Sequence, residues 1–501
     1  MFAIVLLAVL CAAYLVHNFY WKRRGLPPGP TPWPFVGNTL EFVGSSVDMV
    51  AKLLEWKQRY GPVYTLWMGT EAFVHVADYD VMQETFVKNA DAFTGRWKNF
   101  AIDELRGGNM GIVMSDGALW KEQRRFSLRV LRDFGVGRSI MEENILAETS
   151  IMNASINKQL AKGEVKIMDL KPFIDECIGN IINGIVFGFR LENEKLKEFE
   201  KMKAFMDQQV SAASQAILFL MGPITIRLPF LSSLWKESKN NFDEIFGYLK
   251  RNLNEHRQTF DPDTEPTDFA YAYLKQIHQL QKQGESIENY SDHQMSVLAF
   301  DLWAAGLETT ITTLRWSMLY MVTNPEVQDK VHAELREKIG DRKEITMADR
   351  SSLTYVTAVI NEIQRCANIL PLNVPHRTLE AVSVGKYLIP EDVVIVPSIS
   401  VVHMEEKYFP EPRKFKPERF LQSDGKTLKK VDQLMPFSLG KRQCMGESLA
   451  RMELFLIFAN FMHNFHVSIP KGHSPPNLQP INGATSQPHN YSVAIKRISS
   501  D

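Results

Sequence analysis

The sequence predicts a mainly α-helical protein with a small β region, preceded by an N-terminal transmembrane helix. Helical periodicity dominates from about residue 45 to 370. Further along the chain, short β-type runs at 382–384, 387–389 and 393–396 are separated by turn residues and show no βαβ alternation. Residues 2–21 contain no Lys, Arg, Asp or Glu, which is typical of a membrane span.

Composition favours a large globular protein and excludes several classes. The chain has 501 residues, 45% of them hydrophobic and 23% charged, so it is not disordered. A formal net charge of −1 argues against nucleic-acid binding, because that function needs a basic surface. The four cysteines have neither zinc-site nor disulfide-scaffold spacing, which favours a reduced, cytosol-facing compartment.

The N-terminal stretch is long enough to cross a bilayer, since twenty helical residues span about 30 Å. Tyr20 and Trp21 end it as an aromatic pair, and the basic run 22–24 follows at once. The positive-inside rule then leaves the rest of the chain in the cytosol. A cleaved signal peptide is the alternative, but no basic region precedes the stretch. The expected division is a transmembrane signal anchor (1–21), a basic and proline-rich linker (22–36) and a globular domain (37–501).

A long central helix is predicted over residues 291–324. Ser291 and Gln294 form a capping-box signature at its start, and Asn324-Pro325 supplies the stop. At about 50 Å it is far longer than an average helix. Charged residues within it, among them Asp301, argue against a second membrane span. A last apolar helix is predicted at about 447–465.

The stretch 436–447, PFSLGKRQCMGE, carries the most chemical information. Cys444 directly precedes a predicted helix, and a helix N-terminus with nearby cations favours a thiolate. Gly440 and Gly446 permit a tight loop, and Arg442 could pair with an anionic group beside the sulfur. An isolated cysteine is more often an inert buried residue, so this stretch alone leaves both interpretations open.

The pattern Phe437-x-x-Gly440-x-Arg442-x-Cys444-x-Gly446 resembles the haem-ligand loop of the cytochrome P-450 superfamily. The chain looks like the animal microsomal (class II) type, closest to its family 2-like, xenobiotic- and lipid-oxidising branch. The resemblance implies the cytochrome P-450 fold and makes residues 37–501 a haem-thiolate catalytic domain. Other segments resemble further motifs of the superfamily, in order: Trp120-x-x-x-Arg124, Ala305-Gly306-Leu307-Glu308-Thr309-Thr310, Glu362-Ile363-Gln364-Arg365 and Pro417-Glu418-Arg419-Phe420.

The resemblance implies haem b with the Cys444 thiolate as the axial ligand of its iron. Thiolate ligation favours O–O cleavage over simple oxygen binding. The implied enzyme is a monooxygenase that inserts one atom of O₂ into a lipophilic xenobiotic, fatty acid or steroid. Its haem propionates would be held by Arg96, Trp120, Arg124, His376 and Arg442. A core tryptophan, surface arginines and a packing histidine are the alternatives for these positions.

Thr309 and Glu308 are the expected catalytic residues, and both would deliver protons. Thr309 lies four residues after Ala305 on the same helix face, so its hydroxyl could instead bond back to a carbonyl. Glu308 could equally sit in a structural ion pair. Gly306 costs about 1 kcal/mol relative to Ala inside a helix, which close approach of a flat macrocycle would justify. The Glu362, Arg365 and Arg419 set is expected to be structural and to retain haem.

The expected substrate pocket is apolar, which favours lipophilic substrates. Asn373 departs from that character and could orient a substrate or simply bond backbone. Residues 216–231 form an apolar, proline-broken stretch that would cap the pocket, dip into the membrane or belong to a buried loop. The residues expected to line the pocket, by matched position, are Ile112, Val113, Met114, Phe300, Trp303, Ala304, Ala305, Leu370 and Val374.

Nothing in the sequence resembles a nicotinamide or flavin domain, so electrons must come from outside. The resemblance and the anchor imply NADPH–cytochrome P-450 reductase at the endoplasmic reticulum membrane, with cytochrome b5 as an optional second partner. The chain would cross that membrane once, with its catalytic domain in the cytosol. A docking patch, or merely a solvated face, is predicted at Lys121, Arg125, Arg129, Arg132 and Lys441.

Two other functions retain the haem. Some relatives isomerise or dehydrate oxygenated lipids without a reductase, but those often lack an acid–alcohol pair such as Glu308-Thr309. A non-enzymatic haem sensor would need neither Thr309 nor a docking face. The intact pair therefore favours monooxygenation.

Overall fold

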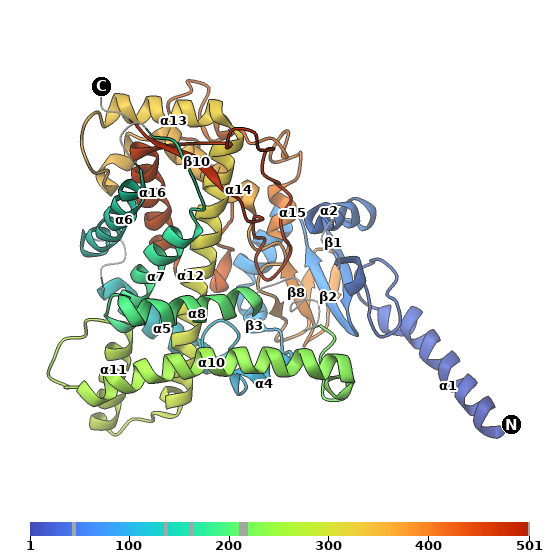
Figure 1. Cartoon of the computed structure of the whole chain (residues 1–501). Helices are drawn as coiled ribbons and strands as arrows, with labels where there is room; N and C mark the ends of the chain where they lie inside the picture. The colour runs from blue at the N-terminus through green and yellow to red at the C-terminus, as the bar shows by residue number, and fades with distance from the viewer. Residues whose placement is uncertain (43–46, 135–138, 161–163, 210–218, 499–501) are drawn as a thin grey trace.

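The structure is a computed structural model that describes residues 1–42, 47–134, 139–160, 164–209 and 219–498. Helices form most of the body, and the N-terminal helix projects from one side of it (Figure 1). The predicted fold class, mainly α with a small β region, is confirmed. Residues 216–218 of the apolar stretch 216–231 lie outside the described residues.

Most of the chain from residue 100 to 370 is helical. The α-helices are α1 (Phe2–Phe19), α2 (Met49–Tyr60), α3 (Tyr79–Met82), α4 (Phe100–Arg106), α5 (Gly117–Asp133), α6 (Ser139–Gln159), α7 (Lys171–Phe187), α8 (Asn193–Gln209), α10 (Pro229–Thr259), α11 (Phe269–Gln283), α12 (Asp292–Thr323), α13 (Pro325–Lys338), α14 (Thr354–Ala367), α15 (Ile399–His403) and α16 (Glu447–Asn464). The β-strands are β1 (Val63–Met68), β2 (Glu71–Val76), β3 (Gly95–Arg96), β4 (Lys166–Met168), β5 (His376–Arg377), β6 (Val382–Val384), β7 (Tyr387–Ile389), β8 (Val394–Pro397), β9 (Phe465–Ser468) and β10 (Val493–Arg497).

The largest sheet has the order β1-β2-β8-β5-β3, in which β2 and β8 run parallel. The pair β6-β7 forms a separate hairpin, and β4-β10-β9 form a third small sheet. The predicted strands at 382–384, 387–389 and 393–396 correspond to β6, β7 and β8. The β1–β2 hairpin lies in the part that was expected to be helical. All six residues of β1 are buried, so the strand shows no alternation of apolar and polar residues.

The central helix α12 has the predicted ends. The Ser291 hydroxyl caps it by accepting the N–H of Gln294 at 3.1 Å, and Asn324 follows its last residue. The buried Asp301 carboxylate on this helix accepts the Arg106 guanidinium at 2.7 Å. It also accepts the N–H groups of Ile112 and Val113 at 2.7 and 2.9 Å. The charge is therefore compensated, and it fixes the loop before α5 against α12.

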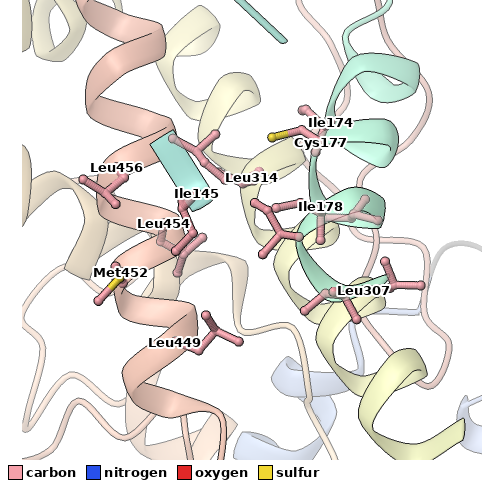
Figure 2. Packing of buried hydrophobic residues seen from close by; sticks show 14 of the residues in the cluster. Ile145, Ile174, Cys177, Ile178, Leu307, Leu314, Leu449, Met452, Leu454 and Leu456 are labelled. Atoms are coloured by element: carbon pink, nitrogen blue, oxygen red, sulfur yellow. The ribbon is translucent and has the colours of Figure 1, made fainter. Parts of the chain in front are cut away.

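The main hydrophobic core lies between α6, α7, α12 and α16. Figure 2 shows Ile145, Ile178, Leu314 and Leu454 of these four helices converging. α7 packs on α12 at Gly306, where an added Cβ would lie 2.6 Å from Cδ1 of Ile182. The structure therefore gives helix packing, in addition to any need of a macrocycle, as the reason for this glycine.

Only α1 with its C-terminal extension, Phe2–Arg23, is long and apolar enough among the described residues to cross a membrane. The segment after it is not a free linker. Its proline-rich part folds back toward the helix, because Asn18 Nδ2 donates to the Pro32 carbonyl and the ring of Tyr14 stacks on that of Phe35. Gly29 packs so closely on β1 that a Cβ there would lie 1.8 Å from the Thr65 carbonyl oxygen.

Candidate active site

A cavity of about 300 Å³ lies between α12 and α16, which lie side by side in the body (Figure 1). Ala305, Gly306 and Thr309 line it from α12. Cys444 and Glu453 line it from the loop before α16 and from α16 itself. The two motifs that the sequence separates by more than a hundred residues thus enclose one space.

The Cys444 loop is held by backbone contacts. The N–H of Cys444 donates to the Phe437 carbonyl at 2.9 Å, and Gly446 directly precedes α16. Gly440 has φ +72°, and a Cβ there would lie 1.9 Å from the Phe86 carbonyl oxygen, so a glycine is required.

Burial raises the pKa of the Cys444 thiol above its ordinary value, while the N–H of Gly446 and the charge of Arg124 lower it. The Cys444 side chain is solvent-exposed and lines the cavity. A thiol in this position loses its proton when it ligates a metal cation, because the cation replaces the proton.

Arg96 and Arg442 form a buried pair of cations beside the cysteine loop. Arg442 donates to the carbonyls of Thr94 and Ser115 at 2.6 and 2.7 Å. Arg96 donates to those of Val113 and Val374, both at 2.9 Å. Within the described chain neither guanidinium bonds a carboxylate. Burial and the charge of Arg96 lower the pKa of Arg442 to about 7, and burial and the charge of Arg124 lower that of Arg96 to about 9, although the charge of Asp116 opposes both shifts.

The charges of these two buried guanidinium groups show whether haem fits this cavity. Both arginines line the cavity that also contains Cys444. A buried cation without an anionic partner is unfavourable, and a bound carboxylate would remove that penalty. A group that brings a metal to the sulfur and carboxylates to the arginines fits these residues.

Trp120 and Arg124 complete the same side of the cavity. The guanidinium of Arg442 lies 3.7 Å from the centre of the Trp120 ring, and Arg124 lies 6.0 Å from it. Arg124 donates to the Gln443 carbonyl at 2.7 Å. His376 is buried nearby, with Nδ1 2.8 Å from the Phe93 carbonyl, but it is not among the described residues that line the cavity. Burial and Arg96 lower the pKa of His376, so the ring is neutral.

The Thr309 side chain faces the cavity, whereas the Glu308 side chain does not. The Thr309 hydroxyl donates to the Ala305 carbonyl at 2.7 Å, which is the back-bonding alternative, and the residue lines the cavity. The Glu308 carboxylate is buried away from it and accepts the Thr485 hydroxyl at 2.9 Å. It also forms an ion pair with Lys203 at 3.4 Å. Lys203 in turn bonds Asp207, near the surface of α8.

The structure divides the expected pocket residues into two groups. Trp303 is fully buried and packs against Phe199 and Tyr248, while Phe300 packs against the ring of Phe242. These α12 residues lie on another face of the helix, since each residue turns the helix by about 100°. Of the predicted residues, the cavity is lined by Ile112, Val113, Ala305, Leu370 and Val374, whereas Met114, Phe300, Trp303 and Ala304 are not among its described lining residues.

Asn373 lines the cavity, but its side-chain amide forms hydrogen bonds with other groups of the protein. It has φ +54°, which an asparagine tolerates better than most residues. Its side chain accepts the N–H of Val374 at 2.7 Å and donates to the Pro397 carbonyl and the Ser438 hydroxyl. The backbone-bonding interpretation of Asn373 agrees with this geometry.

Glu362, Arg365 and Arg419 form a buried cluster rather than an exposed helical pair. Arg365 donates to both carboxylate oxygens of Glu362 at 2.7 and 2.8 Å, and Arg419 donates to the same carboxylate at 3.0 Å. Arg365 also donates to the His403 carbonyl at 2.8 Å.

Sequence reasoning missed His403 and Glu453. The buried imidazole of His403 accepts the N–H of Met435 at 2.9 Å, so it ties the Glu362 cluster to the start of the cysteine loop. Glu453 is buried in α16, where the Thr310 hydroxyl donates to it at 3.2 Å and burial raises its pKa to about 8. A lone acid inside the apolar run of α16 was the available signal for Glu453.

Comparison with known proteins identifies the family. A sequence model of the family "Cytochrome P450" matches residues 27–495. The chain is 34% identical to cytochrome P450 2C16 of Oryctolagus cuniculus, over 98% of this chain and 99% of that protein. It is 33% identical to cytochrome P450 2H1 of Gallus gallus over 98% of each. It is 32% identical to the probable cytochrome P450 CYP36A1 of Caenorhabditis elegans, over 99% of this chain and all of that protein.

The helical fold brings a cysteine loop and buried arginines to one cavity beside a central helix, an arrangement that fits a haem-thiolate protein. The chain belongs to the cytochrome P450 family. The resemblance to its family-2 branch is confirmed by the names of several relatives. Membership supports the function of a haem monooxygenase.

Proposed function

We propose that the chain inserts one atom of O₂ into lipophilic small molecules, with electrons that come from NADPH through a membrane-bound reductase. The observation that carries the proposal is the shared cavity of Cys444, the buried Arg96–Arg442 pair and Thr309. Haem, when bound, supplies oxygen binding and O–O cleavage. Cys444 would ligate its iron. Its propionates would be held by Arg96, Trp120, Arg124, His376 and Arg442.

Proton delivery is the proposed task of α12. The Thr309 hydroxyl holds its proton toward the Ala305 carbonyl and faces the cavity, so rotation about its side chain would offer the proton inward. Glu308 is the proposed source behind it. Its ion pair with Lys203, which also bonds Asp207, gives that carboxylate a polar connection toward the surface of α8.

The substrate is proposed to be a lipophilic xenobiotic, fatty acid or steroid. Ile112, Val113, Ala305, Leu370 and Val374 give the cavity apolar walls, and Asn373 has its polar groups occupied by the protein. Apolar walls with few free polar groups bind apolar ligands by excluding water.

The reductase is proposed to dock on the exposed basic residues of α5 and the cysteine loop. Lys121, Arg125, Arg129 and Arg132 project from α5, the helix that also carries Trp120 and Arg124. Lys441 lies three residues before Cys444 and is exposed. A basic surface over the ligand loop would attract an acidic electron donor. Cytochrome b5 is an optional second partner.

The proposed location is the endoplasmic reticulum membrane, crossed once by residues 1–21, with residues 37–501 as the catalytic domain in the cytosol. Residues 22–36 would connect them. The exposed apolar surface of α1 supports insertion, because such a surface is unfavourable in water. The basic residues that follow it support the orientation.

The test is an untargeted mass comparison. Purified protein with reductase and NADPH is incubated with a lipid extract and a panel of lipophilic drugs, beside a Thr309→Ala sample. We expect compounds that gain one oxygen only with NADPH, in amounts about tenfold lower or more in the variant. Absence of such compounds from thiolate-ligated holoprotein would contradict the proposal and favour the isomerase or sensor function.

A further inference from the structure

A second cavity, of about 250 Å³, lies at the base of the N-terminal helix. One wall is the end of α1 and the residues after it, and the opposite wall is strand β1 with the proline-rich segment. It is remote from the cysteine loop and shares no lining residue with the active-site cavity. Its described lining consists of Phe19, Tyr20, Arg23, Arg24, Leu26, Pro27, Pro28, Gly29, Pro30, Thr65 and Trp67.

The cavity carries positive charge without a balancing acid. Arg23 and Arg24 line it, and Lys22 lies 4.2 Å from the centre of the Trp67 ring. Arg23 donates to the Gly29 carbonyl at 3.0 Å, and Arg24 stacks on Tyr20 and Trp21. In the described part of the chain, none of the three cations is within ion-pair distance of a carboxylate. Backbone oxygens and ring faces orient the cations but do not neutralise them.

A buried hydroxyl gives a second, independent indication of a ligand. Thr65 is 2% exposed, lines the cavity, and its Oγ1 has no hydrogen-bond partner among the described residues. The backbone of Thr65 is fixed against the proline-rich segment, because its N–H donates to the Pro28 carbonyl at 3.0 Å and Gly29 packs on its carbonyl. A buried hydroxyl without a partner costs free energy, which a ligand acceptor would recover.

The position of the cavity relative to the membrane indicates which class of ligand it binds. It begins where the apolar helix ends, at Phe19 and Tyr20, and this is the depth of lipid head groups when α1 spans a bilayer. Its mixed wall combines cations, one hydroxyl and apolar rings. In a phospholipid, the anionic phosphate would contact the cations and the hydroxyl, and the acyl chains would contact the apolar rings.

We propose that this cavity binds the phosphate group of one anionic phospholipid through Arg23, Arg24 and Thr65. The bound lipid joins α1 to strand β1 and so fixes the catalytic body against the bilayer surface. The proposal rests on the proposed function in one respect, the membrane-spanning role of residues 1–21.

The test uses the full-length holoprotein in nanodiscs made from equal amounts of phosphatidylglycerol, whose only charge is its phosphate, and phosphatidylcholine, whose phosphate is balanced by an ammonium group. Native mass spectrometry counts the lipids retained after mild release. We expect one phosphatidylglycerol in clear excess over phosphatidylcholine. Arg23→Gln with Arg24→Gln should lower that selectivity about tenfold or more, because each basic residue near a lipid surface strengthens binding roughly fivefold.

The matched control removes two cations elsewhere. Arg336→Gln with Lys338→Gln changes exposed residues at the end of α13, on the far side of the body from α1 (Figure 1), and should leave the selectivity unchanged. Thr65→Val keeps shape and charge and should lower selectivity by a smaller, severalfold amount. This variant keeps the test decisive if the double arginine variant loses its haem or fails to insert.

Each contrary outcome has one meaning. Equal loss in the control pair, or unchanged selectivity in both the Arg23–Arg24 and Thr65 variants, overturns the site. Displacement of phosphatidylglycerol by an equal concentration of inorganic phosphate overturns the lipid as ligand in favour of free phosphate. Flotation of the wild type with vesicles separates the two proposals. Protein that floats but selects no lipid refutes only the site, and protein that does not float refutes the anchor.

Discussion

The guanidinium of Arg442 lies 3.7 Å from the centre of the Trp120 ring and donates only to backbone carbonyls. The contact joins α5 to the cysteine loop, and it places a buried cation beside Cys444 before any ligand arrives. Carbonyl dipoles and a ring face hold such a charge in position without neutralising it. The site is therefore prepared for an anion, and under the proposed function that anion is a haem propionate.

Replacement of Arg442 tests this preparation. Arg442→Leu removes a buried cation that has no carboxylate partner, but it also leaves the Thr94 and Ser115 carbonyls without their donor. These effects oppose each other, so the fold without haem should change little in stability, while haem affinity should fall about tenfold or more. Haem titration followed by absorbance measures the affinity. The exposed neighbour Lys441 gives the control, since Lys441→Gln should bind haem as the wild type does. Equal affinity of the Arg442 variant and this control would contradict the role.

The Glu362 cluster should be among the most sensitive parts of the fold. Glu362→Ala leaves Arg365 and Arg419 buried without their carboxylate, a loss of about 3–5 kcal/mol in the free energy of unfolding. Denaturant unfolding and the fraction of protein purified with haem report it. The adjacent Glu418 pairs with Lys330 at the surface, so Glu418→Gln should cost about 1 kcal/mol or less. A small effect at Glu362 would show that the cluster is not structural.

Gly306 should tolerate a side chain only when Ile182 is shortened. An added Cβ would lie 2.6 Å from Cδ1 of Ile182, so Gly306→Ala should destabilise the protein by about 1–3 kcal/mol. Ile182→Val removes that methyl group, and the double variant should recover most of the loss. Thermal unfolding of the four proteins gives the coupling. If the two substitutions have additive effects on stability, the contact with Ile182 is not the reason for the glycine at position 306.

The buried Glu453 carboxyl should make the free energy of unfolding depend on pH. Burial raises its pKa to about 8, above the unfolded value of 4.5, so the folded state holds a proton that the unfolded state releases. The resulting stability is fully present below pH 4.5 and is lost as the pH rises through about 8. Glu453→Gln keeps the shape without this loss, so its advantage in unfolding temperature should widen from pH 5 to pH 8.5. A constant difference would contradict a buried neutral acid.

The reductase surface predicts a salt effect. Lys121→Glu with Arg125→Glu reverses two exposed charges on α5 and should slow electron transfer from the reductase several-fold while weakening its dependence on ionic strength. Stopped-flow reduction measures both quantities. If both the rates and their salt dependence are unchanged, the reductase does not dock on these basic residues.

Local signals explain what the sequence could predict. The ends of α12 were predictable because Ser291 and Asn324-Pro325 act within one helical turn. The cysteine loop was predictable because its glycines and ligand lie within ten residues. The burial of Glu362 with Arg419 followed from the family resemblance, since an isolated pair at this spacing reads as exposed.

Long-range packing explains the rest. The wholly buried β1 has no period of its own, and only its partner β2 makes it a strand. Trp303 and Ala305 are equally apolar neighbours on α12, and the rotation of the helix decides that only Ala305 lines the cavity. The cavity at the base of α1 depends on the fold-back of the proline-rich segment onto β1, which composition alone does not encode.

The most direct test of the central claim is the source of the oxygen in the product. Purified holoprotein is incubated with reductase, NADPH, a lipophilic substrate found by the mass comparison and isotopically labelled dioxygen. A monooxygenase gives product with one labelled atom, and none when labelled water replaces labelled dioxygen. Product labelled from water, or product formed equally without NADPH, would contradict the account.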